Sequence, residues 1–195
     1  MGIPDENVEF TAKAHERAKT ELYPAIFGVE RSYLSFESTL LHESYKGQIC
    51  DGELGIDCLV RITAKRLWMR APLVFSFQER FRPISYLKEQ DVTITTWSYD
   101  SKQPAELYKI IAEYFLYGYY DPIEDTFRDA INIKMTEVKW GLMNHRYCLN
   151  RSQHKSSGNQ SFIAIPFREL YKDGVVTYWM QEPKTNKTLA QGVLL

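Results

Sequence analysis

The sequence contains few cysteines, no long apolar run and no excess of charge of one sign. Its 195 residues include three cysteines, none in a Cys-x-x-Cys spacing, and an odd number argues against a disulfide framework. No stretch approaches the roughly 20 apolar residues that a membrane span requires. The N-terminal segment MGIPDENVEF lacks the basic and apolar regions of a signal peptide. These absences predict a soluble protein of the cytoplasm.

The charges nearly cancel, with 24 Lys and Arg against 25 Asp and Glu, so the surface as a whole is not cationic. Their distribution is uneven. Residues 1–57 hold eleven acids and five Lys or Arg, whereas Val138–Arg168 holds five Lys or Arg and no acid. The later segment is therefore a candidate for a surface that follows phosphates.

Glycine-rich phosphate loops of the P-loop and dinucleotide-binding types are absent, as are internal repeats and low-complexity tracts. This excludes the nucleotide-binding classes that depend on such loops. A chain of this length fits one domain, residues 1–195, which is large enough to bury its own core without metal or disulfide cross-links.

Two runs typical of β-strands, Ile56–Thr63 and Leu73–Phe81, each carry polar residues in apolar surroundings. Successive side chains of a strand point to opposite faces of a sheet. Gln78 and Arg80 therefore project from one face of the second run, and Asp57 stands near the start of the first. Because a polar group buried without a partner is costly, these three side chains are the candidates for a functional site.

Asp57, Gln78 and Arg80 together match the chemistry of a phosphate-processing site. Carboxylate and amide oxygens are ligands that Mg²⁺ accepts, and a guanidinium stabilises negative charge on a phosphate. The alternative interpretation is structural, with Asp57 and Arg80 forming an ion pair between neighbouring strands. The residues alone leave both interpretations open.

The order of these features resembles a known family. An acidic helix is followed by DGELGID at a strand start and then by FQER, a hydrophobic-Gln-x-Arg motif. This order is similar to that of the PD-(D/E)XK nuclease superfamily, especially the branches that resemble Holliday-junction resolvases and modification-dependent restriction enzymes. Gln-x-Lys is a frequent form of the second motif there. The resemblance extends over about Glu9–Tyr178.

The resemblance implies an α/β fold with a restriction-endonuclease-like core, in which helices flank a central mixed sheet of four or five strands. It implies a Mg²⁺-dependent endonuclease, with Mn²⁺ as a substitute ion, that hydrolyses DNA phosphodiester bonds. A homodimer would allow both strands to be cut.

The resemblance also assigns roles to residues. The catalytic residues would be Asp57, Gln78, Arg80 and, on the first helix, Glu16, with Glu21 as the other candidate there. The metal ligands would be Asp57, Gln78 and the backbone carbonyl of Glu79. A β-bulge would be needed to turn the Glu79 carboxylate toward the ion as a substitute ligand.

Arg80 stands where the family has lysine. A guanidinium binds phosphate oxygens in a bidentate manner, but it does not give up a proton to orient or activate water. The alternative function is therefore a catalytically inactive nucleic-acid-binding module of the same fold. A third possibility, an interaction protein without nucleic-acid contacts, is motivated by the near-zero net charge.

Six cations are candidates for nucleic-acid contacts: Lys65 and Arg66 at the tip between the two strands, Arg82 after the second, and Arg146, Arg151 and Lys155 in the polar loop Asn144–Gly158. A DNA-contacting role explains why that loop has no acidic residues. A plain solvated loop is the first alternative. The second is a zinc site formed by His145, Cys148 and His154, which lacks a fourth ligand.

Hydrophobic periodicity predicts the remaining elements. The expected helices are Val8–Tyr23, ended by Pro24, then Pro104–Tyr117 and Pro166–Tyr171. The further expected strands are Asp91–Tyr99, Ala130–Trp140, Phe162–Ile165 and Val175–Trp179.

Overall fold

A computed structural model describes residues 5–38, 54–63, 72–98, 102–144, 146–147, 150–154 and 160–181. The α-helices are α1 (Asp5–Phe27), α3 (Glu106–Lys109), α4 (Met135–Met143) and α5 (Phe167–Lys172), and the 3₁₀ helices are η1 (Arg31–Tyr33) and η3 (Ile84–Glu89). The strands are β1 (Leu34–Ser38), β2 (Cys58–Ile62), β3 (Leu73–Pro83), β4 (Asp91–Ser98), β5 (Gln103–Pro104), β6 (Tyr114–Asp121), β7 (Thr126–Lys134), β8 (Asn150–His154), β9 (Gln160–Pro166) and β10 (Val176–Trp179).

Six of the described strands form one mixed sheet in the order β1-β2-β3-β6-β7-β10. Neighbouring strands are antiparallel except for β3 and β6, which are parallel. A second, antiparallel sheet has the order β5-β4-β9-β8. Parallel neighbours require a crossover, and here the connection from β3 to β6 contains β4, β5 and α3.

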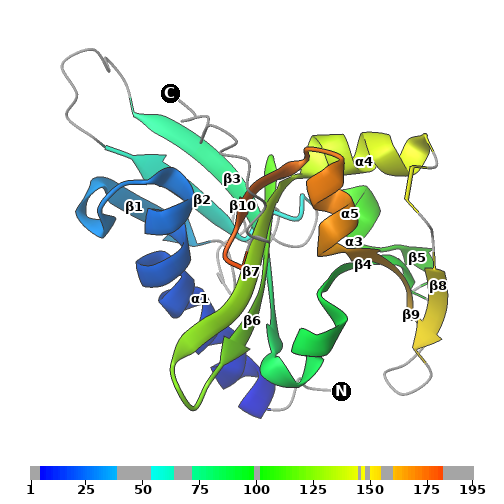
Figure 1. The fold of residues 1–195 in the computed structure, drawn as a ribbon, viewed down its shortest axis with the longest axis horizontal. Coiled ribbons are helices and arrows are strands. Elements are labelled where there is room, and N and C mark those ends of the chain that lie inside the picture. Colours follow the sequence, from blue (N-terminus) through cyan, green and yellow to red (C-terminus); the bar gives the residue numbers. More distant parts are fainter. Residues whose placement is uncertain are drawn as a thin grey trace.

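Helix α1 covers one face of the six-stranded sheet (Figure 1). Ala14, Ala18 and Leu22 follow one another at intervals of four residues and are fully buried, so they form the apolar stripe of an amphipathic helix. They pack with side chains of β2, β3, β6 and β7. The other face of the sheet packs against β4, β9, α4 and α5, which enclose the second core cluster.

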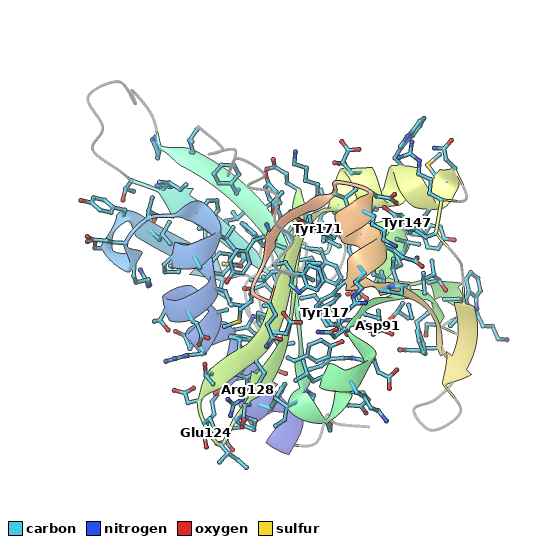
Figure 2. All side chains as sticks on the ribbon, viewed as in Figure 1. Asp91, Tyr117, Glu124, Arg128, Tyr147 and Tyr171 are labelled. Atoms are coloured by element: carbon cyan, nitrogen blue, oxygen red, sulfur yellow. The ribbon has the colours of Figure 1, made fainter. Side chains whose placement is uncertain are left out.

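Strand β6 is the centre of the molecule, because all of its residues are buried. Its side chains alternate between the two cores: Phe115 and Tyr117 face the second sheet, and Tyr114 and Leu116 face α1. Tyr117 lies between β6 and the second sheet in Figure 2, where its hydroxyl oxygen is 3.1 Å from Thr93 Oγ1.

Several sequence predictions are confirmed. Helix α1 contains the expected helix 8–23, and β2, β3 and β4 correspond to the expected strands. The strand β9 leads directly into α5, and β10 follows, as predicted. The α/β class with a mixed sheet is also confirmed.

The expected helix Pro104–Tyr117 is wrong. This stretch contains the short strand β5, the single turn α3 and the start of β6. A strand buried on both faces reads as a continuous apolar run, which periodicity does not distinguish from a buried helix. The Tyr-rich start of β6 therefore predicts the end of a helix although it forms a strand.

The expected number of four or five strands in the central sheet is also wrong, since the sheet has six. The edge strand β1 has only five residues, of which Leu34 alone is buried, so its short alternation is a weak signal. Pro24 does not end α1, which continues to Phe27. The expected strand 130–140 divides into the end of β7 and α4.

In the part of the chain that the structure describes, no helix is both long and apolar enough to span a membrane.

Candidate functional site

The predicted polar cluster lies where the chain enters β2. Gly55 has a φ of 56° there, and a side chain at this position would meet the backbone of Ile110, with a Cβ 2.9 Å from the Ile110 Cα. Only glycine fits both conditions. The turn delivers Asp57 to the strand edge, where its N–H donates to the Phe77 carbonyl at 2.8 Å.

The Asp57 carboxylate is buried, with 2% of the residue exposed. Its Oδ2 accepts two hydrogen bonds from β3, one from the Gln78 side-chain amide at 2.7 Å and one from the Glu79 backbone N–H at 2.8 Å. Hydrogen bonds to a charged acceptor are stronger than neutral ones. The bond from Gln78 joins two residues that the sequence predicts as part of the site, Asp57 before β2 and Gln78 on β3.

The Gln78 side chain is only partly satisfied. Its Oε1 is buried and has no hydrogen-bond partner among the described residues. It lies 3.1 Å from the position that a Cβ on Gly55 would occupy, so it points toward the glycine turn. An unpaired buried acceptor costs about 1–3 kcal/mol, and this oxygen is therefore a ready ligand for a donor or a cation.

Arg80 projects from the same face of β3 as Gln78, as the strand alternation predicts. Its Nη2 lies 2.5 Å from Glu106 Oε2, and its Nη1 donates to the Thr93 carbonyl at 3.1 Å. Glu106 also accepts the Thr95 backbone N–H. The guanidinium is therefore bonded to α3 and β4, whereas Asp57 is bonded to Gln78 and Glu79. These contacts do not support the structural alternative, an ion pair between Asp57 and Arg80.

Glu79 occupies the opposite face of β3, toward α1. The register of β3 with β2 and β6 is unbroken, so the bulge considered for this residue is not present. The Glu79 carboxylate accepts the Tyr23 hydroxyl at 2.6 Å, and its other oxygen lies 2.5 Å from His15 Nδ1. The Glu79 side chain is therefore on the wrong side to join Gln78 as a metal ligand.

The structure does not bring the acidic residues of the first helix to Asp57. The Glu16 side chain is 73% exposed and pairs with Lys19. Glu21 binds Arg17 and the β7 residue Thr126. Helix α1 lies on the Glu79 face of the sheet, so neither carboxylate borders Gln78.

The predicted nucleic-acid contacts are distributed over separate parts of the fold. Arg82 follows Arg80 on the same face of β3, with its guanidinium over the Tyr86 ring at 4.8 Å. Arg146 is exposed beyond α4, and Arg151 belongs to β8 in the second sheet.

Most of the other candidates for nucleic-acid contacts or for a zinc site lie outside the described residues. Lys65, Arg66 and Lys155 lie outside the described residues, as do the zinc candidates His145 and Cys148. The third zinc candidate, His154, is in β8.

Two charged residues border the site but were not predicted as part of it. Glu106 belongs to the stretch 104–117, whose apolar periodicity predicts a core helix and not a site residue. Lys139 on α4 donates a hydrogen bond to the carbonyl of Ile110, the residue that packs against Gly55. Burial lowers the pKa of Lys139. No spacing in the sequence links either residue to Asp57.

Across the described ranges, no group of three or more His, Cys, Asp or Glu side chains is placed to hold a metal ion. The oxygen groups of the cluster are the Asp57 carboxylate and the Gln78 amide oxygen. In comparisons with known proteins, no family model, curated protein or solved structure matches this chain.

The Gly55 turn yields a prediction about stability. We expect Gly55→Ala to lower the free energy of unfolding by about 3 kcal/mol, because a positive φ and a backbone clash act together. The matched control is Gly28→Ala, where φ is 61° but nothing lies within 4 Å of the added Cβ; there we expect a loss of about 1 kcal/mol. Urea unfolding of both variants measures the difference. Equal losses would show that the Ile110 contact relaxes without cost.

Proposed function

We propose that this chain is a metal-dependent endonuclease that hydrolyses DNA phosphodiester bonds at the Asp57–Gln78 cluster. The observation that carries the proposal is the contact between the buried carboxylate and the side-chain amide across β2 and β3. Arg80 follows on the same face of β3. The elements follow the order on which the resemblance to PD-(D/E)XK nucleases depends. A helix comes first, then a strand that begins beside Asp57, and then an antiparallel strand with the Gln-x-Arg motif.

The oxygen groups at this cluster fit Mg²⁺, with Mn²⁺ as the substitute. Mg²⁺ is usually held by one or two protein groups, while waters and substrate phosphates complete its shell. Asp57 and Gln78 Oε1, which has no hydrogen-bond partner among the described residues, are the groups that would hold the ion. Such an ion supplies Lewis-acid polarisation and activation of water.

The protein's own groups would orient the substrate. Glu106 and Thr93 engage two of the five N–H donors of Arg80, and the Arg80 side chain remains 30% exposed. The remaining donors are available to phosphate oxygens, on which they would stabilise negative charge. The Glu79 N–H keeps the Asp57 carboxylate beside Gln78.

A binding module that does not cleave is the second candidate. It is favoured by one observation: Arg80 is paired with Glu106, and a guanidinium remains protonated near neutral pH, so it does not give up a proton to activate water. This candidate keeps the DNA surface and lacks the hydrolytic step. The two functions differ in whether plasmid DNA is nicked.

Cleavage is tested with Asp57→Asn. With plasmid DNA and Mg²⁺ or Mn²⁺, we expect the wild type to nick DNA and the variant to lose about 100-fold or more in rate, since the amide removes the charged metal ligand. Asp129→Asn is the matched control, because Asp129 is also fully buried and accepts bonds from Trp179 and Gln90. Its rate should be unchanged.

The outcome separates the candidates. A wild type that retards DNA in a salt-sensitive manner without nicking supports the binding module. A wild type that neither nicks nor binds contradicts both candidates and supports an interaction protein without nucleic-acid contacts.

The DNA surface is tested by salt dependence. We expect Arg146→Ala combined with Arg151→Ala to weaken DNA binding and to flatten the slope of log K against log salt by up to about two units, roughly one per lost phosphate contact. The control is Lys13→Ala with Lys88→Ala, two exposed cations elsewhere on the fold. Affinities at several salt concentrations give both slopes. An unchanged slope in the first variant removes the α4–β8 region from the interface.

A further inference from the structure

A buried polar trio lies directly behind the candidate site, on the α1 face of β3. Glu79 is 7% exposed, His15 is 8% exposed and Tyr23 is fully buried. Both carboxylate oxygens of Glu79 are occupied, one by the Tyr23 hydroxyl at 2.6 Å and the other by His15 Nδ1 at 2.5 Å. The trio joins the middle and end of α1 to β3.

The surroundings of the trio are apolar. Phe81 meets the His15 ring edge-on at a centroid distance of 5.0 Å, and Phe77 meets the Tyr23 ring at 4.9 Å. Burial raises the pKa of the Tyr23 hydroxyl and of the neighbouring Cys58 thiol well above their usual values. Both groups therefore remain protonated, and Tyr23 is a permanent donor to Glu79.

Packing alone does not require this arrangement. Helix α1 already presents Ala14, Ala18 and Leu22 to the sheet. Replacing buried polar groups by apolar side chains of similar volume is often neutral or stabilising. The presence of a buried carboxylate with two donors thus calls for a second role.

That role follows from the backbone of Glu79. The backbone N–H of the same residue donates to Asp57 Oδ2 at 2.8 Å, and the side-chain amide of Gln78 donates to the same oxygen at 2.7 Å. The bonds to Tyr23 and His15 restrain the Glu79 side chain, and the backbone of Glu79 moves with it. The pairing of Glu79 with Leu116 on β6 holds this backbone, and the bonds to α1 add a second restraint on the N–H that donates to Asp57.

We propose that His15 and Tyr23 are positioning residues for Asp57: through Glu79, they hold the backbone N–H that fixes the Asp57 carboxylate beside Gln78. The consequence for cleavage rests on the proposed function, whereas the consequence for the Asp57 carboxylate does not. Helix α1 thus contributes to the site from the opposite face of the sheet, without a side chain that touches the substrate.

The test uses Tyr23→Phe and His15→Gln in the full chain, with Tyr120→Phe as the matched control. Tyr120 is also fully buried against α1, and its hydroxyl donates to Asp125 at 2.7 Å. All three variants lose a bond to a carboxylate, but Tyr120 has no connection to Glu79 in the described contacts. Because the Asp125 side chain is 67% exposed and that of Glu79 only 3%, the losses of global stability differ, and exchange of the Glu79 amide is therefore compared with that of other β3 amides in the same variant.

The readout is NMR, which does not depend on activity. In Tyr23→Phe and His15→Gln we expect hydrogen exchange of the Glu79 amide, measured relative to the other amides of β3, to become roughly tenfold faster than in Tyr120→Phe. Exchange of the other β3 amides should change only by the loss of global stability in each variant. If exchange of the Glu79 amide, relative to the other amides of β3, matches that in Tyr120→Phe, the inference is overturned.

Cleavage rates then separate the inference from the function. If the wild type nicks DNA, we expect kcat to fall about tenfold in Tyr23→Phe and His15→Gln with KM for DNA unchanged, because positioning of a site group affects the reaction and not DNA binding. If the NMR changes appear in a protein that does not nick DNA, the inference stands and the proposed nuclease function fails. If DNA is nicked equally by all variants and the NMR signals match, the inference fails and the function stands.

Discussion

The hydrogen bonds from β3 to the Asp57 carboxylate are the constraint on which the site depends. A carboxylate that is 98% buried is tolerated only where donors replace water, and here the Glu79 N–H and the Gln78 amide provide them. Because one of the donors is backbone, the carboxylate is tied to the strand itself and not only to a side chain. The entrance to β2 and the middle of β3 thus form one unit.

The segment from Glu106 to Ile110 closes this unit on the Gln78 face. Glu106, at its start, binds Arg80, and Ile110, at its end, packs against Gly55. The N–H of Ile111 also donates to the Leu54 carbonyl. A segment held at both ends in this manner fixes the guanidinium and the glycine turn relative to each other. The crossover between the two parallel strands is therefore part of the site and not only a connection.

The sequence predicted the parts of the site that depend on local periodicity. Alternation along β3 placed Gln78 and Arg80 on one face, and the glycine turn indicated how Asp57 enters β2. The partners Glu106, His15 and Tyr23 are 26, 64 and 56 residues along the chain from the β3 residues that they contact. Such pairings depend on topology, which local periodicity does not determine.

The ion pair of Arg80 determines what the guanidinium contributes to either function. Glu106 balances its charge, so Arg80 offers positioned N–H donors and little net attraction for phosphate. Donors in a fixed orientation contribute to geometry, whereas affinity for nucleic acid then depends on cations elsewhere on the fold. Either function would use Arg80 in this way, although a guanidinium that stays protonated favours the binding module. The difference between them lies at Asp57 and Gln78, where an ion either joins the two oxygen groups or does not.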